Sequence, residues 1–293
     1  MMQHHEGTFL SADGWHLYYQ NWVPADLVRG VIVIIHGLGG HSGGFSRIVE
    51  NLVHRGYLVY GLDLRGHGRS PGQRGYINRW SEYREDLSRF LMEIQYRECQ
   101  LPCFLLGHSL GALVVLDYSL RSPSQISGAI AIAPALRQVG VSPIKMLVGQ
   151  ILSQICPRFS LNTGIDEASA SRDLAVLQTY ARDPLRHNKG TARLATEFLV
   201  TTAWVWKHGL DLQVPLLVMH GEADRVTSAS ASYEFFRQIS FSDKKWCAYT
   251  DGYHHLHDDF DYLEVLADLG NWLDQHLESH QSSGREKPSV SCS

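Results

Sequence analysis

Short apolar runs and amphipathic stretches alternate along most of this chain. The clearest run is Val31–Ile35, five consecutive β-branched residues, a pattern typical of a strand buried on both faces of a sheet. Similar runs occur at 58–62, 104–106, 129–133, 215–220 and 245–249. Stretches with helical spacing, such as 46–54 and 80–99, separate them. Strands that alternate with helices predict an α/β fold with a mostly parallel central sheet and helices on both of its faces.

Three regions depart from this alternation. Residues 7–24 alternate between apolar and polar positions around Gly14, which predicts an antiparallel hairpin at a sheet edge. Residues 137–212 carry helical patterns and no strand signal. We therefore predict an all-helical cap at 137–212, inserted between two core segments, 1–136 and 213–278. The polar end, 279–293, is predicted to be disordered.

The strongest chemical signal lies where one apolar run meets a helix. Phe104–Leu106 leads into Gly107-His108-Ser109-Leu110-Gly111, and a helix-like stretch follows directly. In this context the G-x-S-x-G pattern forms a sharp turn that exposes a nucleophilic serine. Glycine on either side avoids collisions in so tight a turn, and the start of a helix favours negative charge. Ser109 is therefore the predicted nucleophile.

A second copy of the same pattern, Gly40–Gly44, makes Ser42 a competing candidate. Gly37-Leu38-Gly39 separates this copy from the preceding apolar run, so its context favours an ordinary loop serine. The loop 36–41 also lacks the Lys-Ser/Thr pair of a phosphate-binding P-loop. We interpret it as an oxyanion loop, in which the backbone N–H groups of Leu38 and Leu110 stabilise a developing negative charge.

The remaining catalytic groups are expected at other strand ends. Asp224 follows the run 215–220, and a cluster of histidines follows the run 245–249. Because the carboxyl ends of parallel strands meet at one edge, an acid and a base can converge there on Ser109. His254, His255 and His257 compete for the role of base. Asp63 and His67 also follow a strand, but we interpret them as residues that shape their loop.

Composition narrows the class of protein. The chain has 293 residues, 44% of them hydrophobic and 19% charged, which allows one large globular domain or two small ones. A net charge of −4 gives no electrostatic reason to bind nucleic acid. The N-terminus lacks the features of a signal peptide, and no apolar run is long enough to span a bilayer. Five cysteines without metal-ligand spacing favour a reducing compartment and no metal. We expect a cytoplasmic protein without cofactors.

Taken together, five motifs make the chain resemble a known family. They are His36-Gly37-x-Gly39-x-His41-Ser42, Asp63-x-Arg65-Gly66-His67-Gly68-x-Ser70, Gly107-His108-Ser109-Leu110-Gly111, His220-Gly221-x-x-Asp224-x-Val226 and Tyr253-His254-x-Leu256-His257. The order Ser…Asp…His is that of α/β-hydrolases. Over nearly its whole length, to about residue 277, the chain resembles their monoacylglycerol lipase and lysophospholipase branch.

The resemblance implies an α/β-hydrolase fold, with the cap inserted before the strand that bears the aspartate. It also implies a triad of Ser109, Asp224 and His254, since the family's base directly follows the tyrosine, and it implies that His257 contacts a glycerol group. The chain departs from the animal enzyme at Gly40 and Gly44. An acidic residue and an arginine stand there in that enzyme, beside the polar head of the substrate.

The leading functional hypothesis is a serine carboxylic-ester hydrolase that cleaves lipid monoesters through an acyl-enzyme intermediate. An esterase or thioesterase for smaller acyl groups is the alternative. A non-catalytic binding protein is disfavoured because all three triad members are present. The expected partner is thus a small lipid or acyl-ester substrate.

One amphipathic helix of the cap bears on this substrate. Its aliphatic residues recur at i, i+3, i+4, i+7, i+8 and i+11, on a single face: Ile144, Leu147, Val148, Ile151, Leu152 and Ile155. Packing against neighbouring helices is one interpretation, and a lid over Ser109 is the other. As a lid, Ile144, Leu147, Val148 and Ile151 would bind the acyl chain, and the cap could touch a membrane surface transiently.

Overall fold

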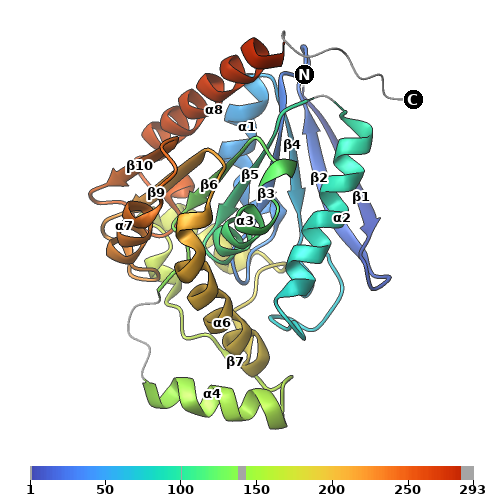
Figure 1. Cartoon of the computed structure of the whole chain (residues 1–293). Helices are drawn as coiled ribbons and strands as arrows, with labels where there is room; N and C mark the ends of the chain where they lie inside the picture. Colours follow the sequence, from blue (N-terminus) through green and yellow to red (C-terminus); the bar gives the residue numbers. More distant parts are fainter. Residues whose placement is uncertain (1, 100, 138–142, 285–293) are drawn as a thin grey trace.

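The computed structural model describes residues 2–99, 101–137 and 143–284. Its centre is an eight-stranded sheet with the order β1-β2-β4-β3-β5-β6-β9-β10 (Figure 1). The strands are β1 (Gln3–Leu10), β2 (His16–Val23), β3 (Gly30–Ile35), β4 (Tyr57–Leu62), β5 (Cys103–His108), β6 (Gly128–Ile132), β9 (Leu216–Gly221) and β10 (Lys244–Tyr249). From β4 to β10 every pairing is parallel, whereas β1 and β2 are antiparallel. The α/β prediction and the edge hairpin are confirmed.

Burial explains why the middle of the sheet could be read from the sequence. Every residue of β3, β4, β5, β6 and β9 is buried. In β3, Ile32 and Ile34 face one side of the sheet, while Val33 and Ile35 face the other. A strand covered on both faces gains free energy from apolar side chains at every position, so its pattern is a continuous run.

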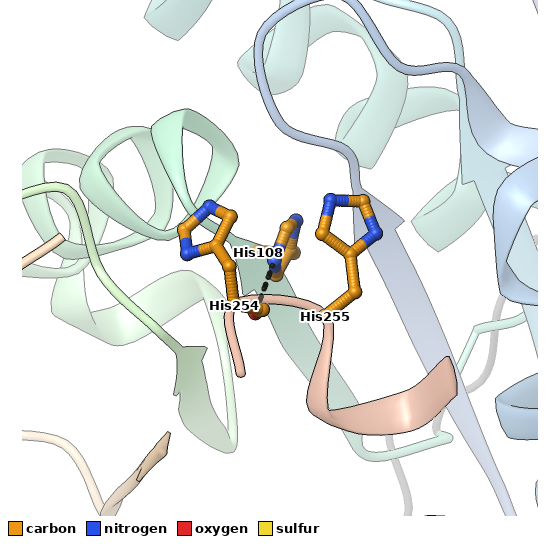
Figure 2. A group of neighbouring side chains, drawn as sticks. All are labelled: His108, His254 and His255. Carbon is orange, nitrogen blue, oxygen red and sulfur yellow. Dashed lines mark hydrogen bonds between the residues drawn. The ribbon is translucent and has the colours of Figure 1, made fainter. Parts of the chain in front are cut away.

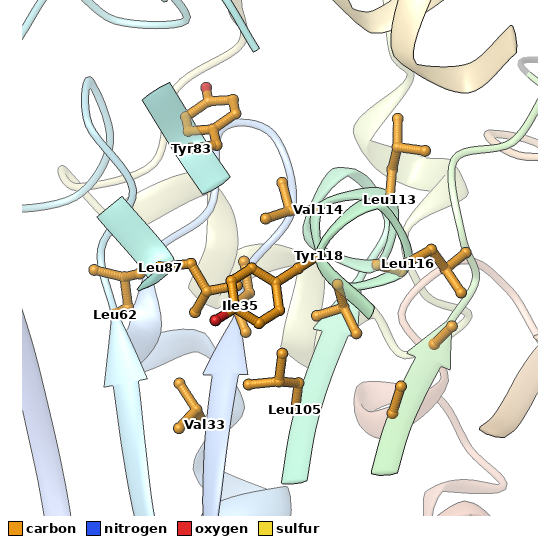
Figure 3. Packing of buried hydrophobic residues seen from close by; sticks show 14 of the residues in the cluster. Val33, Ile35, Leu62, Tyr83, Leu87, Leu105, Leu113, Val114, Leu116 and Tyr118 are labelled. Atoms are coloured by element: carbon orange, nitrogen blue, oxygen red, sulfur yellow. The ribbon is translucent and has the colours of Figure 1, made fainter. Parts of the chain in front are cut away.

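Helices cover both faces of the sheet. Their bounds are α1 (Ser46–His54), α2 (Ser81–Arg97), α3 (Leu110–Arg121), α7 (Ala229–Gln238) and α8 (Tyr262–Gly284). Side chains of α1 and α8 pack on one face, and those of α2, α3 and α7 pack on the other. Figure 3 shows part of the second layer, where Tyr118 of α3 lies beside Ile35 and Leu105 of the strands, while Leu113 lies on the side of α3 away from the sheet.

The segment before β9 interrupts the alternation, as predicted, but it is not all-helical. It holds α4 (Pro143–Ile155), α5 (Leu174–Arg182) and α6 (Ala192–His208), together with β7 (Ser160–Asn162) and β8 (Lys189–Thr191). The two short strands form an antiparallel pair of their own, so the all-helical prediction is wrong. A three-residue strand is too short to show a period of two in the sequence.

The end of the chain also differs from its prediction. Helix α8 continues to Gly284, so residues 279–284 are helical and not disordered. Residues 285–293, which complete the predicted tail, lie outside the described part of the chain. Among the helices that are described, none combines the length and the apolar character needed to cross a bilayer.

Candidate active site

Ser109 occupies the turn between β5 and α3. Its φ is 55°, a left-handed conformation that is rare outside glycine. The flanking glycines are required by close contacts. A Cβ on Gly107 would lie 2.4 Å from the carbonyl oxygen of Gly111, and one on Gly111 would lie 2.1 Å from that of Ile35. The turn is therefore packed too tightly for a side chain at position 107 or 111.

His254 lies between Ser109 and Asp224. Its Nε2 is 3.0 Å from the Oγ of Ser109, and its Nδ1 is 2.7 Å from Oδ2 of Asp224. Asp224 follows β9, Ser109 follows β5 and His254 follows β10, so three strand ends bring these side chains together. The predicted site residues thus form one hydrogen-bonded chain of the kind that activates a serine hydroxyl.

The carboxylate of Asp224 is held from several directions. Oδ1 accepts hydrogen bonds from the backbone N–H groups of Val226 at 2.7 Å and Thr227 at 3.0 Å. Oδ2 also accepts from the Thr227 hydroxyl at 2.9 Å and lies 3.1 Å from Nε2 of His220. Burial raises the pKa of this carboxyl, but the charge of His254 and the hydrogen bonds from His220 and His254 outweigh it and hold the pKa well below its usual value.

His220 and Thr227 are site residues that the sequence analysis did not single out. Both lie within four residues of Asp224, and both are buried. The signal for His220 was present, because it opens the motif His220-Gly221-x-x-Asp224. Nothing in the sequence distinguishes Thr227 from any other threonine that follows a turn.

The three candidate histidines have different partners. Nδ1 of His255 is 3.0 Å from the hydroxyl of Tyr180, and the ring of His257 stacks on Phe45 at 4.8 Å. Within the described chain, only His254 reaches both Ser109 and Asp224. Its position is fixed further by His108, whose Nε2–H donates to the carbonyl oxygen of His254 at 3.1 Å (Figure 2).

The same figure shows the one group of described side chains with spacing suited to a metal ion. Nitrogens of His108, His254 and His255 lie within 4.8 Å of one another. Both ring nitrogens of His254, however, already have partners in Asp224 and Ser109. A metal here would have to displace Ser109 from the base, so the arrangement fits proton transfer better than metal binding.

The glycine-rich loop after β3 is pressed against Ser109. A Cβ on Gly37 would lie 3.0 Å from that of Ser109. His36 shapes the loop: its Nδ1–H donates to the carbonyl oxygen of Gly37 at 2.7 Å, and its Nε2 accepts from the N–H of Leu64 at 3.0 Å. Burial lowers the pKa of His36 to about 4, so the ring stays neutral and keeps both bonds at neutral pH.

A cavity of about 330 Å³ opens beside Ser109. On the core side it is lined by residues that include Leu38, Phe45, Val226 and His254. On the other side it is lined by the segment 163–188, which includes Ile165, Tyr180 and Arg186. Backbone hydrogen bonds hold this segment to the core, among them His187 N–H to Gly39 O at 3.0 Å and His255 N–H to Ala170 O at 2.8 Å.

None of the described side chains of α4, the helix expected to bind substrate, lines this cavity. Ile151 of α4 is 52% exposed, and it is absent from the described lining residues. The side chains of Ile144, Leu147 and Val148 lie outside the described part of the structure. Helix α4 packs against α6, and Figure 1 shows it well away from the carboxyl ends of the strands.

Comparison with known proteins agrees with this architecture. Residues 26–261 match the family described as serine aminopeptidase, S33. The monoacylglycerol lipase of Mycolicibacterium smegmatis is 31% identical over 274 residues, which cover 93% of this chain and 98% of that protein. The monoglyceride lipase of Rattus norvegicus is 28% identical, over 92% of this chain and 90% of its own.

Solved structures give the same result. The crystal structure of the Paleococcus ferrophilus monoacylglycerol lipase superposes with a TM-score of 0.82 at 30% identity, covering 89% of this chain and 99% of that one. A soluble variant of the Saccharomyces cerevisiae monoglyceride lipase, in complex with a substrate analogue, gives 0.83 at 25% identity, with 93% and 94% covered. The chain is a serine ester hydrolase, and it belongs to the monoacylglycerol lipase-like family of α/β-hydrolases.

Proposed function

We propose that Ser109, His254 and Asp224 are the catalytic triad of an enzyme that hydrolyses long-chain monoesters of glycerol. The observation that carries the proposal is the chain of hydrogen bonds of 3.0 and 2.7 Å from Ser109 through His254 to Asp224, at the wall of a cavity. Such an arrangement gives a serine hydroxyl the general base that it otherwise lacks.

In the proposed reaction, the Oγ of Ser109 attacks the ester carbonyl while Nε2 of His254 takes its proton. The N–H groups of Leu38 and Leu110 stabilise the oxyanion, and Asp224 stabilises the imidazolium. When the intermediate collapses, His254 returns the proton to the departing alkoxide, which leaves as the alcohol. The acyl group remains bound to the Oγ of Ser109. Water, activated by His254, then attacks the acyl group and releases the fatty acid.

The size and the lining of the cavity support a monoester substrate. A volume of about 330 Å³ is at the lower end for small-molecule pockets, which suits one acyl chain better than several. Leu38, Ile165 and Val226 supply apolar surface, and His257 supplies a polar group near Ser109. Relatives that bear the name monoacylglycerol or monoglyceride lipase support the same substrate class.

Residues 137–212 are proposed to act as a cap that meets lipid aggregates. Several large apolar side chains of this segment are exposed to solvent: Ile151, Ile155, Phe159, Leu161 and Leu174. Apolar surface in this quantity on the cap is suited to brief contact with a membrane or micelle. In this arrangement α4 contacts the lipid surface, and the segment 163–188 covers the substrate.

The proposed substrate class can be tested by varying the length of the acyl chain. Each methylene buried in the cavity contributes ~0.8 kcal/mol, so kcat/KM should rise roughly fourfold per methylene from acetyl to octanoyl p-nitrophenyl esters. Replacing the cavity residue Ile165 by serine should flatten this dependence and leave acetyl-ester turnover near that of the wild type. Ile151→Ser is the matched control, because it makes the same kind of change on the exposed helix and should keep the slope.

Two results would count against the proposal. A wild-type enzyme that turns over acetyl esters best would favour the alternative of an esterase for small acyl groups. A flattened slope in Ile151→Ser, with a normal slope in Ile165→Ser, would return the acyl-binding role to α4.

A further inference from the structure

One cation of the cavity, Arg186, contacts an aromatic ring but forms no ion pair with the residues that the structure describes. Arg186 lies in the loop between α5 and β8 and lines the cavity. Its guanidinium stacks over the ring of Tyr180, 4.0 Å from the centroid. Within the described part of the chain, Arg186 forms no side-chain hydrogen bond and no ion pair. A partly buried guanidinium has up to five N–H donors to satisfy, so this one is free to bind a ligand.

The core presents little side-chain bulk below this guanidinium. Among the described residues, and apart from the chain neighbours of Gly44, the only atom within 4 Å of a Cβ built on Gly44 is Nη1 of Arg186, at 3.8 Å. Gly44 and Arg186 both line the cavity. An arginine contributed by the cap therefore faces a position where the core has no side chain.

A second unsatisfied group lies close by. His257 is 1% exposed, and its Nδ1 has no hydrogen-bond partner among the described residues. Stacking on Phe45, the neighbour of Gly44, fixes its ring in the cavity wall. A buried ring nitrogen without a partner costs ~1–3 kcal/mol, which a bound polar ligand can recover. His257 and Arg186 both line the cavity, and the charge of Arg186 acts on the ring of His257, so one oxygen-rich group is the natural ligand for both.

The surrounding charges determine what that group can be. Asp258 pairs with Arg47 at 3.7 Å and accepts from the Tyr180 hydroxyl. Asp183 pairs with His41 at 2.7 Å and accepts from the N–H of Leu185. Asp166 and Glu167 are exposed at the mouth of the cavity.

The neighbouring histidines add no compensating charge. Burial lowers the pKa of both His255 and His257, and the charge of Arg186 lowers each further, so both rings are neutral at pH 7. The nearer carboxylates, Asp183 and Asp258, are paired with other residues, and the charge of Arg186 acts on Asp183 without a direct ion pair among the described residues.

We propose that Arg186 and His257 form a head-group subsite that selects monoacyl esters whose alcohol carries an oxyanion, of which a phosphate is the strongest example. A planar guanidinium binds phosphate oxygens through two parallel hydrogen bonds, and the stack on Tyr180 holds it in place for this contact. The inference rests on the proposed function, because the head group must be bound while its ester reaches Ser109. It assigns to a cap residue the choice among lipid monoesters.

The experiment compares three esters of one fatty acid: 1-oleoylglycerol 3-phosphate, 1-oleoylglycerol and methyl oleate, each at the same mole fraction in neutral detergent micelles. Arg186→Ala should lower kcat/KM for the phosphate ester by ~10–100-fold, the value of a charge-assisted hydrogen-bond pair, mainly through KM. The loss should be smaller for 1-oleoylglycerol and absent for methyl oleate. Arg186→Lys should retain part of the phosphate preference, because it keeps the charge without the planar fork.

Arg182→Ala is the matched control. Arg182 is an exposed arginine at the end of α5, outside the described lining of the cavity, and its loss should leave all three substrates unaffected. An equal loss on all three substrates in Arg186→Ala, or no loss on the phosphate ester, would overturn the subsite. A larger loss on neutral 1-oleoylglycerol than on the phosphate ester would overturn the preference for charge. Failure of the wild type on all three esters would instead contradict the proposed hydrolase function.

Discussion

The molecule contains two G-x-S-x-G segments at the same edge of the sheet, and they are built in opposite ways. Ser109 follows β5 without an intervening residue, has a strained backbone and lies 3.0 Å from the ring of His254. Ser42 begins the short 3₁₀ helix η1 (Ser42–Phe45) and is 1% exposed. Its Oγ accepts a hydrogen bond from Gln20 at 2.8 Å, and its N–H donates to Asp63 at 2.7 Å.

The difference shows that the glycines carry different information in the two copies. Around Ser109, Gly107 and Gly111 allow the backbone to pack so closely that a Cβ at either position would clash with it. Among the described residues, a Cβ on Gly44, in the other copy, would make only an ordinary contact with the far end of the Arg186 side chain. The same G-x-S-x-G pattern therefore has a different role depending on what precedes it. Directly after a strand, the serine is presented at a tight turn; after an intervening loop, it is buried as a structural hydroxyl.

The largest expected effect is that of Ser109→Ala. Removing the nucleophile should lower kcat by on the order of 10⁶-fold and abolish labelling by a fluorophosphonate, since no other group can form the acyl-enzyme. Active-site labelling followed by mass measurement of the intact protein would detect it. If Ser109→Ala still accepts the label and Ser42→Ala does not, the roles of the two serines are exchanged.

Asp224→Asn should have the next largest effect, about 10⁴-fold in kcat. Two backbone N–H groups fix one oxygen of Asp224, so the amide of an asparagine would direct its NH₂ toward Nδ1 of His254. That contact forces the imidazole into the tautomer that cannot accept the proton of Ser109. The fold should persist, as judged by circular dichroism.

Asp251→Asn is the control, because Asp251 is exposed on the neighbouring loop and should tolerate the change. Wild-type activity in Asp224→Asn would exclude Asp224 as the acid. The pKa of the Asp224 carboxyl lies well below its usual value, so this group stays ionised when pH falls toward 4 and should not cause the acid-side loss of activity.

The carboxyl edge of the sheet could be predicted in detail because several constraints act there within a few residues. A strand buried on both faces leaves a continuous apolar run, a tight turn leaves glycine pairs, and the next helix begins at once. Ser109, Asp224 and the histidine cluster at 254–257 were predicted by this logic. Choosing His254 over His255 and His257 needed the family resemblance, because the spacing alone left all three open.

The cap could be predicted only in outline. Helical period shows that one face of α4 is apolar, but it cannot show whether that face meets substrate, protein or solvent. Ile151 is exposed, and the cavity is covered by the segment 163–188, where short strands and turns leave weak patterns. Nothing in the sequence singled out Arg186. Its proposed role depends on the absence of an ion pair among the described residues, and only three-dimensional contacts reveal such an absence.

The smallest expected effect is that of Ser42→Ala, which should retain full labelling and activity but lose ~1–3 kcal/mol of the free energy of unfolding. The loss arises because the Nε2 of Gln20, a side chain that is 7% exposed, would lose its acceptor inside the protein. Thermal or urea unfolding would measure it. Replacing both partners, as in Ser42→Ala with Gln20→Met, removes the unsatisfied donor as well and should recover part of the loss. A double variant less stable than the sum of its single changes would contradict this account, and the burial of Ser42 would then need another explanation than its bond to Gln20.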